Sequence, residues 1–324
     1  MAMHLWAVAE AAEGRAAGAS RSDTAGYAAG LTTWLIGASV LVVAHALAGE
    51  MPPWTLCCTR SLISALVLLP LVARHRRDIV AFLRSHWREA ALIGAMGLGL
   101  TQGVMFTALG LTSAVNVAIV FGLTPLITMV LARLLLGEPM NALQALGSAI
   151  AFAGIVTICV QGSLVRLLGF DFGFGDILAL GAAFLFAGYT VLLKRAKFDL
   201  PRIPLLVILL SAGSLASLPF ALFEHFNGAH DHMTMRGYGA LLYCGIIGGA
   251  LTYLLYNTSV EILGAARAGN LLYTQMLFVA LLSWIFLGDS LQWYHFLGAG
   301  LVIAGVLDVT LLRSRPPQPQ AAAG

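Results

Sequence analysis

Charged residues are scarce in this sequence. Only 10% of its 324 residues are Asp, Glu, Lys or Arg, whereas soluble domains average about 25%. Hydrophobic residues make up 59% of the chain, and the mean hydropathy is +0.88. The apolar residues form runs of about twenty, which is the length that an α-helix needs to cross a bilayer core. The scarcity of charge therefore argues against an ordinary soluble domain and indicates a membrane protein.

The chain also has few cysteines and a small net charge, and it lacks common enzyme motifs. The net charge of +3 is too small to indicate a nucleic-acid partner. Walker A, HExxH and GxSxG motifs are missing, so we expect no enzyme of these classes, no cofactor and no metal centre. The four cysteines lie inside apolar runs without the spacing of a disulfide framework or a metal site, and we interpret them as small buried side chains: Cys57, Cys58, Cys159 and Cys244.

Acidic residues are missing from the middle of the apolar runs, since Asp176, Asp289 and Asp308 all lie near run ends. Proton-coupled exporters of cations usually need a carboxylate inside the membrane. The sequence therefore disfavours a cationic-drug pump and is compatible with a facilitator that lacks energy coupling. His45 is the one candidate titrating group within the runs, with a simple hydrogen-bonding role as the alternative.

Ten apolar runs can be marked along the chain, at about 25–48, 53–73, 89–109, 112–135, 140–161, 174–194, 203–223, 237–258, 265–287 and 291–312. Most basic residues fall in loops and tails that an even number of spans places on one side: Arg15, Arg21, Arg74, Arg76, Arg77, Arg84, Arg88, Lys194, Arg195, Lys197, Arg202, Arg313 and Arg315. By the positive-inside rule this side is cytoplasmic. We therefore expect an all-α membrane protein of ten transmembrane helices, with cytoplasmic tails at 1–23 and 313–324.

One passage occurs twice. LGEPMNALQALGSAIAFAGI at 136–155 returns at 287–306 as LGDSLQWYHFLGAGLVIAGV, an offset of 151 residues. The same offset also pairs residues further upstream, such as Gly97 with Gly248. The chain is therefore predicted to contain two related units.

Each predicted unit holds five spans, at 24–161 and 173–312. The first runs of the two units align loosely at an offset of 144, which pairs His45 with Tyr189. Because five is odd, the second unit enters the membrane from the opposite side. Inverted repeats of this kind are the architecture of secondary transporters with alternating access, whose substrate binds near the midplane between the repeats.

Two five-helix units that close with Gly-acid and then Leu-Gly…Ala-Gly resemble the drug/metabolite transporter superfamily, specifically its paired EamA-type units. The resemblance covers about residues 25–312. It is carried by Arg60, Pro125, the pair Gly137-Glu138 and the pair Gly288-Asp289, while Met276 stands where a proline equivalent to Pro125 is expected. Members export amino acids, other metabolites or drugs. This chain looks most like the amino-acid exporters, including the aromatic amino acid exporter group.

Polar side chains within the spans are the candidate substrate-binding residues, because such groups usually face a cavity or a neighbouring helix. They are His45, Gln102, Asn116, Tyr189, Tyr253, Tyr256, Asn257, Asn270, Tyr273 and Gln275. The spacing of Tyr253, Tyr256 and Asn257 puts them on one helix face. Amides, hydroxyls and aromatic rings suit an amino acid, whereas plain interhelical hydrogen bonding is the alternative. Arg60 is open to two interpretations, a carboxylate contact for substrate or a structural partner of helix-end carbonyls or Glu50.

We therefore expect a multi-pass transporter of the bacterial inner membrane that exports aromatic or large neutral amino acids. The sequence is compatible with transport that lacks energy coupling. The alternative is an exporter of another small metabolite or drug in the same fold. The exact substrate, the direction of transport and the oligomeric state stay open. The lipid bilayer and a small-molecule substrate are the expected partners.

Two motifs suggest other functions. The GxGD at 173–176 resembles that of intramembrane aspartyl proteases, but no Tyr-Asp pair supplies the second carboxylate that such a site needs. Glu224, His225, His230, Asp231 and His232 form a loop that could bind a metal, although a flexible polar loop is favoured. A channel is a third alternative, which ion conductance would distinguish from a carrier.

Overall fold

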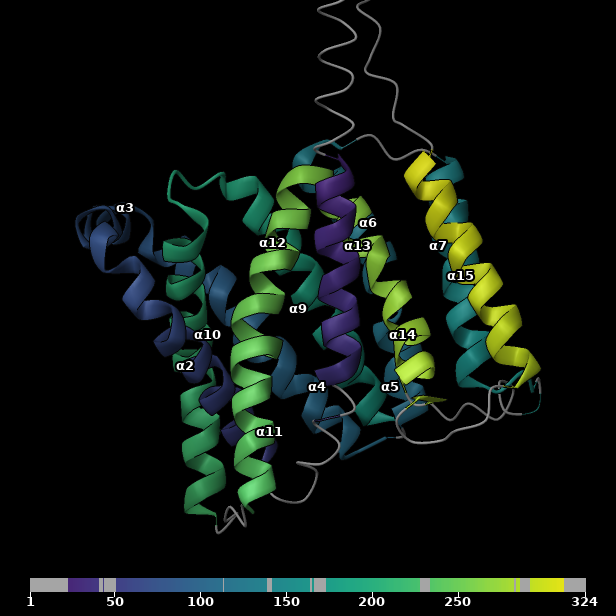
Figure 1. Ribbon diagram of the computed structural model, residues 1–324, viewed down its shortest axis with the longest axis horizontal. Helices are drawn as coiled ribbons and strands as arrows, with labels where there is room; N and C mark the ends of the chain where they lie inside the picture. The colour runs from purple at the N-terminus through teal and green to yellow at the C-terminus, as the bar shows by residue number, and fades with distance from the viewer. Residues whose placement is uncertain are drawn as a thin grey trace, which may run out of the picture.

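The computed structural model describes residues 23–40, 43, 51–112, 114–138, 142–163, 165, 173–227, 234–282, 284–285 and 292–311. These residues contain helices and no strand (Figure 1), as the predicted all-α class requires. The first helix covers residues 23–40. The others are α2 (Pro53–Val72), α3 (Arg76–Gly94), α4 (Thr101–Leu109), α5 (Ala114–Phe121), α6 (Thr124–Leu136), α7 (Ala142–Cys159), α9 (Phe174–Ala196), α10 (Arg202–Phe226), α11 (Met235–Gly245), α12 (Thr252–Leu263), α13 (Ala265–Asn270), α14 (Thr274–Leu282) and α15 (Trp293–Leu311).

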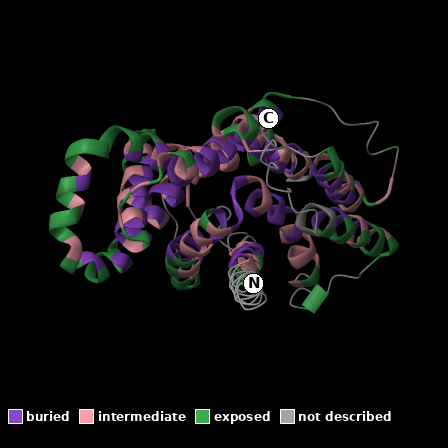
Figure 2. Cartoon of the chain, turned by 90° about the horizontal axis from the view of Figure 1, so that it is seen from above, coloured by how far each residue is buried: buried purple, intermediate pink, exposed green. Residues whose placement is uncertain are grey.

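Six helices of the described residues are long and apolar enough to cross a membrane: Pro53–Leu109, Asn116–Leu136, Ala142–Cys159, Phe174–Ala196, Arg202–Phe226 and Met235–Leu263. Figure 2 shows exposed residues on the outer sides of the helices and buried residues between them. Large apolar side chains such as Leu66, Leu134 and Phe223 are exposed, which suits contact with lipid. The fold is therefore that of a membrane protein, while ten spans and cytoplasmic termini stay predictions.

The long basic connection at 74–88 is helical. α2 passes through a 3₁₀ turn, Ala73–His75, directly into α3. The arginines of this stretch are exposed, whereas Phe82 is buried and lies 5.0 Å from the Phe198 ring just after α9. α3 is amphipathic, so its apolar side chains lie on one face. Phe82 lies on this face, and its edge-on contact with Phe198 holds α3 against the end of α9.

Two π-helical turns lie at equivalent places in the two repeats. Ala95–Leu100 separates α3 from α4, and Ile246–Leu251 separates α11 from α12, at the 151-residue offset of the sequence. Each is closed by the threonine that follows it, whose hydroxyl donates to the carbonyl five residues earlier, at 2.6 Å from Thr101 and 2.9 Å from Thr252. The sequence repeat is thus also a repeat of local structure, and π turns often occur at functional sites.

The fourth and ninth predicted spans are both broken. α5 ends at Phe121, because Pro125 has no N–H to donate to that carbonyl, and the Thr124 hydroxyl takes its place. In the second repeat a 3₁₀ turn, Leu271–Tyr273, separates α13 from α14, and the Thr274 hydroxyl donates to Leu271 at 2.7 Å. The second break therefore forms without a proline, and Met276 does not straighten the ninth span.

The recurring passage forms the interface between α7 and α15, which lie side by side in Figure 1. A Cβ on Gly154 would lie 2.7 Å from the Gly298 carbonyl oxygen. A Cβ on Gly305 would collide with the Gly147 carbonyl oxygen. Under the 151-residue offset these are the same contact seen from either copy, so each passage packs its glycines against the other passage. Small residues at such crossings let membrane helices approach closely.

The first helix and α9 are also equivalent, but with a different offset from the predicted 144. A Cβ on Gly97 in the first π turn would collide with the Tyr189 side chain of α9. A Cβ on Gly248 in the second π turn would lie 2.5 Å from Val40 of the first helix. These contacts favour an offset of 149 residues, which pairs Tyr189 with Val40 and not with His45.

Candidate functional site

Tyrosines and an amide meet where α9 packs against α12. Tyr189 of α9 donates its hydroxyl to Asn257 Oδ1 of α12. Tyr256 forms a hydrogen bond of 2.7 Å with Thr190 Oγ1, and its ring is stacked near that of Tyr189, with centroids 6.4 Å apart. Tyr253 meets the same Tyr189 ring edge-on, at 6.3 Å. Four of the predicted site residues therefore share one cluster, which joins the second repeat's first helix to its third.

Two further aromatic rings extend this cluster. Trp34 of the first helix lies edge-on to Tyr256 at 5.7 Å and to Phe186 of α9 at 6.3 Å. Phe186 in turn lies 5.2 Å from Tyr256. Neither Trp34 nor Phe186 was predicted from the sequence, because an aromatic residue inside an apolar run looks like ordinary core. We call the six residues Trp34, Phe186, Tyr189, Tyr253, Tyr256 and Asn257 the aromatic cluster.

Arg60 of α2 reaches the edge of the aromatic cluster. Its Nη1 donates to Gln102 Oε1 of α4 at 3.4 Å, and its Nη2 donates to the Gly248 carbonyl in the second π turn at 3.2 Å. Its guanidinium carbon lies 6.0 Å from the centroid of the Tyr253 ring. The Tyr253 hydroxyl donates to the Gly97 carbonyl in the first π turn at 3.4 Å. Arg60 thus links Gln102 to Tyr253 of the aromatic cluster, by a hydrogen bond to Gln102 and by its position near the Tyr253 ring.

Asn116 lies elsewhere, in a network at the start of α9. Its Nδ2 donates to Thr112 Oγ1 at 3.2 Å, and that hydroxyl donates to Asp176 Oδ1 at 3.1 Å. The other Asp176 oxygen accepts from the Gly173 amide at 2.7 Å, which caps α9. The acid of the GxGD motif is therefore a helix cap, and Asn116 supports it.

The predicted residues of the ninth span do not join the aromatic cluster. Asn270 Oδ1 accepts from Ser148 of α7 at 3.0 Å. Tyr273 is fully buried, and the Gln275 amide lies beside Gly37 of the first helix, 3.0 Å from where a Cβ would be. His45 lies outside the described residues.

Several buried polar atoms of the described residues have no hydrogen-bond partner: Tyr27 OH, Trp34 Nε1, Ser259 Oγ, Asn270 Nδ2 and Tyr273 OH. All of these groups can donate, and an indole or amide N–H can only donate. Leaving a buried donor unsatisfied costs about 1–3 kcal/mol. Trp34 belongs to the aromatic cluster, so the cluster contains one buried donor without a hydrogen-bond partner.

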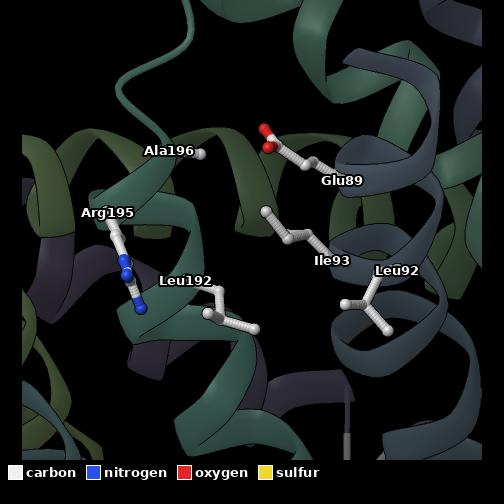
Figure 3. A pocket seen from close by; sticks show the side chains of 6 residues that line it. All are labelled: Glu89, Leu92, Ile93, Leu192, Arg195 and Ala196. Carbon is white, nitrogen blue, oxygen red and sulfur yellow. The ribbon is translucent and has the colours of Figure 1, made fainter. Parts of the chain in front are cut away.

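A separate pocket opens between α3 and α9 (Figure 3). Its volume is about 380 Å³, and Glu89, Leu92, Ile93, Leu192, Arg195 and Ala196 line it. This size falls in the range of small-molecule pockets. None of its lining residues was predicted as a site residue, and none belongs to the aromatic cluster.

Glu224 and His225, predicted to begin a polar loop, lie instead in the last turn of α10. Glu224 Oε2 accepts from the Thr55 amide at 2.8 Å and from its hydroxyl at 3.0 Å, while Oε1 accepts from the Trp54 amide at 3.0 Å. Glu224 thus caps the N-terminus of α2 from a different helix. A negative charge is favourable there because the helix dipole is positive at its N-terminus. The described residues contain no group of three or more metal-ligating side chains, and residues 230–232 lie outside them.

The model of the EamA-like transporter family matches this chain over residues 24–160 and 173–311, which is once in each repeat. The chain belongs to this family. The family is one of transporters, and several relatives are named as transporters. The EamA-type assignment made from the sequence is confirmed, and the aromatic amino acid exporter subgroup is not tested by this match.

Similar proteins come from bacteria, archaea and plants. The chain is 27% identical to the uncharacterized transporter YyaM of Bacillus subtilis, over 69% of this chain and 73% of that protein. It is 26% identical to an uncharacterized transporter of Archaeoglobus fulgidus, over 79% and 87%. It is 25% identical to the WAT1-related protein At3g02690 of Arabidopsis thaliana, over 68% and 54%. One crystal structure with 20% identity has the same fold, with a TM-score of 0.74 over 90% of this chain and 97% of that one.

Proposed function

We propose that this transporter exports amino acids with aromatic or large neutral side chains across the bacterial inner membrane. The observation that carries the proposal is the aromatic cluster, in which three tyrosines, a tryptophan, a phenylalanine and an amide meet between the first helix, α9 and α12. Aromatic rings pack on an apolar side chain and attract an ammonium group. The amide and hydroxyls can bond the polar groups of the same solute.

Alternating access between two inverted five-helix repeats is the proposed mechanism. Its support is the matched pair of π turns and the matched pair of helix breaks, which give each repeat the same local irregularities. Discontinuous helices at equivalent places are typical of carriers with inverted repeats. Ten spans with both termini in the cytoplasm complete this proposed topology.

Export without energy coupling belongs to the same proposal. The described residues of the aromatic cluster include no carboxylate and no histidine, so the cluster itself offers no proton-carrying group in the physiological range. A facilitator of this kind moves its substrate down whichever gradient exists.

Counterflow in proteoliposomes tests the proposal. Vesicles loaded with unlabelled tryptophan, phenylalanine, methionine or threonine should accumulate the labelled amino acid, with and without a pH gradient. A sugar and a nucleoside serve as controls and test the alternative of another metabolite. Stimulation by amino acids alone, unchanged by the gradient, supports an uncoupled amino-acid carrier. Folded protein that shows no stimulation with any amino acid refutes the substrate assignment.

A further inference from the structure

Arg60 is a cation whose charge has no acidic partner among the described residues, and Glu50, the partner that the sequence suggested, lies outside them. The two ion pairs there are Lys194–Glu138 and Arg202–Glu261. Both acceptors that Arg60 contacts, the Gln102 amide and the Gly248 carbonyl, are neutral. An arginine within a membrane span is costly, and such a residue typically marks a substrate or ion pathway.

The hydrogen bond to Gly248 does not by itself explain why this residue is charged. Gly97 is the equivalent of Gly248 in the first repeat, and its carbonyl accepts from a neutral group, the Tyr253 hydroxyl. Each π-turn carbonyl thus finds a donor from the opposite repeat, once from a hydroxyl and once from a guanidinium. A neutral donor is sufficient for this carbonyl, so this hydrogen bond does not account for the positive charge.

The charge also has no counterpart in the second repeat. A Cβ on Gly94 would lie 2.5 Å from the Leu209 carbonyl of α10. A Cβ on Gly245, its equivalent, would lie 3.4 Å from the Arg60 carbonyl of α2. Leu209 therefore occupies the place of Arg60 in the second repeat. A residue that only supported helix packing would be needed in both copies, whereas a single cation suits a ligand with a single anionic group.

A guanidinium carries five N–H donors in a planar fork, and the two contacts above use two of them. The fork matches a carboxylate in shape and charge. Arg60 lies against Tyr253, at the edge of the aromatic cluster. We propose that Arg60 binds the carboxylate of the transported solute while the aromatic cluster holds its apolar side chain. This inference rests on the proposed amino-acid transport and assigns the anionic end of the substrate.

The test compares tryptophan with tryptophanamide, which lacks the carboxylate charge. Each compound competes with labelled tryptophan in counterflow, and each is tested as a thermal stabiliser of the purified protein in detergent. Wild type should prefer the acid by about tenfold or more, as expected for a charge-assisted hydrogen bond. Arg60→Gln should bind the two compounds within about twofold, and Arg60→Lys should keep part of the preference. Arg133→Gln, which removes an exposed arginine in the last turn of α6, should behave as wild type.

Equal binding of acid and amide by wild type would overturn the assignment, and so would an unchanged preference in Arg60→Gln. If Arg60→Gln weakened both compounds by the same factor, the residue would be structural only. If that variant did not fold, wild type and Arg60→Lys would decide. Wild type without counterflow for any amino acid would refute the proposed function instead. The stabilisation measurement needs no transport, so it judges Arg60 in that case too.

Discussion

Gly305 and Gly300 lie on the same helix, α15, and give opposite predictions for substitution by alanine. At Gly305 a Cβ would lie 2.6 Å from the Ala151 amide nitrogen and closer still to the Gly147 carbonyl oxygen. Both are backbone atoms of α7, which cannot turn away as a side chain can. At Gly300 nothing lies within 4 Å of the same position. Gly305→Ala must therefore push α15 away from α7, whereas Gly300→Ala has free space.

Overpacking of this kind typically costs about 1–3 kcal/mol. Alanine also favours a helix over glycine by up to about 1 kcal/mol, which applies equally to both variants. With about 2–4 °C per kcal/mol for chains of 150–250 residues, Gly305→Ala should melt about 2 °C or more below Gly300→Ala. Gly154→Ala, the equivalent substitution in α7, should do the same because its Cβ would lie 2.7 Å from the Gly298 carbonyl.

Thermal unfolding of the three purified variants in one detergent, followed by tryptophan fluorescence, measures this difference. Gly300→Ala is the matched control for helix propensity and for handling. If Gly305→Ala and Gly154→Ala melted at or above the control, the close packing of the two recurring passages would be wrong.

Three further substitutions test other contacts. Glu224→Ala removes the cap of α2 and should lower the free energy of unfolding by about 1–2 kcal/mol, read from the melting midpoint; an unchanged midpoint would contradict the capping role. Tyr189→Phe takes the donor away from Asn257 Oδ1 and should slow tryptophan counterflow at normal yield of folded protein; wild-type rates would argue against the aromatic cluster as the site. Separating the partly exposed pair Lys194–Glu138 should cost less than about 1 kcal/mol, and a double-mutant cycle with alanine at both positions checks this small coupling.

Much of the architecture could be predicted from the sequence, because the bilayer imposes long apolar helices. The offset of 151 residues between recurring passages also predicted which helices would match. The helix breaks were harder to predict. Pro125 marks one of them, but the Leu271–Tyr273 turn has no proline and depends on tertiary packing around Thr274. The offset of the first helices was misjudged because few identities guide it, whereas the Gly97 and Gly248 contacts define it.

The candidate site was only partly predictable. Spacing put Tyr253, Tyr256 and Asn257 on one face of α12, and the structure brings Tyr189 to that face. Spacing could not reveal that Asn116 and Thr112 form a network with Asp176, since Asp176 lies 64 residues from Thr112 in the sequence. Trp34 was not predicted as a site residue, because aromatic residues are as common in cores as in binding sites.

The two π turns have a mechanical consequence. Each holds one residue more than an α-helical turn would, and one residue corresponds to a rotation of about 100° around the helix axis. If a π turn relaxed to α geometry, everything beyond it would rotate by that amount. Gln102 follows the first turn closely and Tyr253 follows the second, so either step would swing a neighbour of Arg60 away from it. Each half of the transporter thus contains a point where a helix can change register while staying hydrogen-bonded within the membrane.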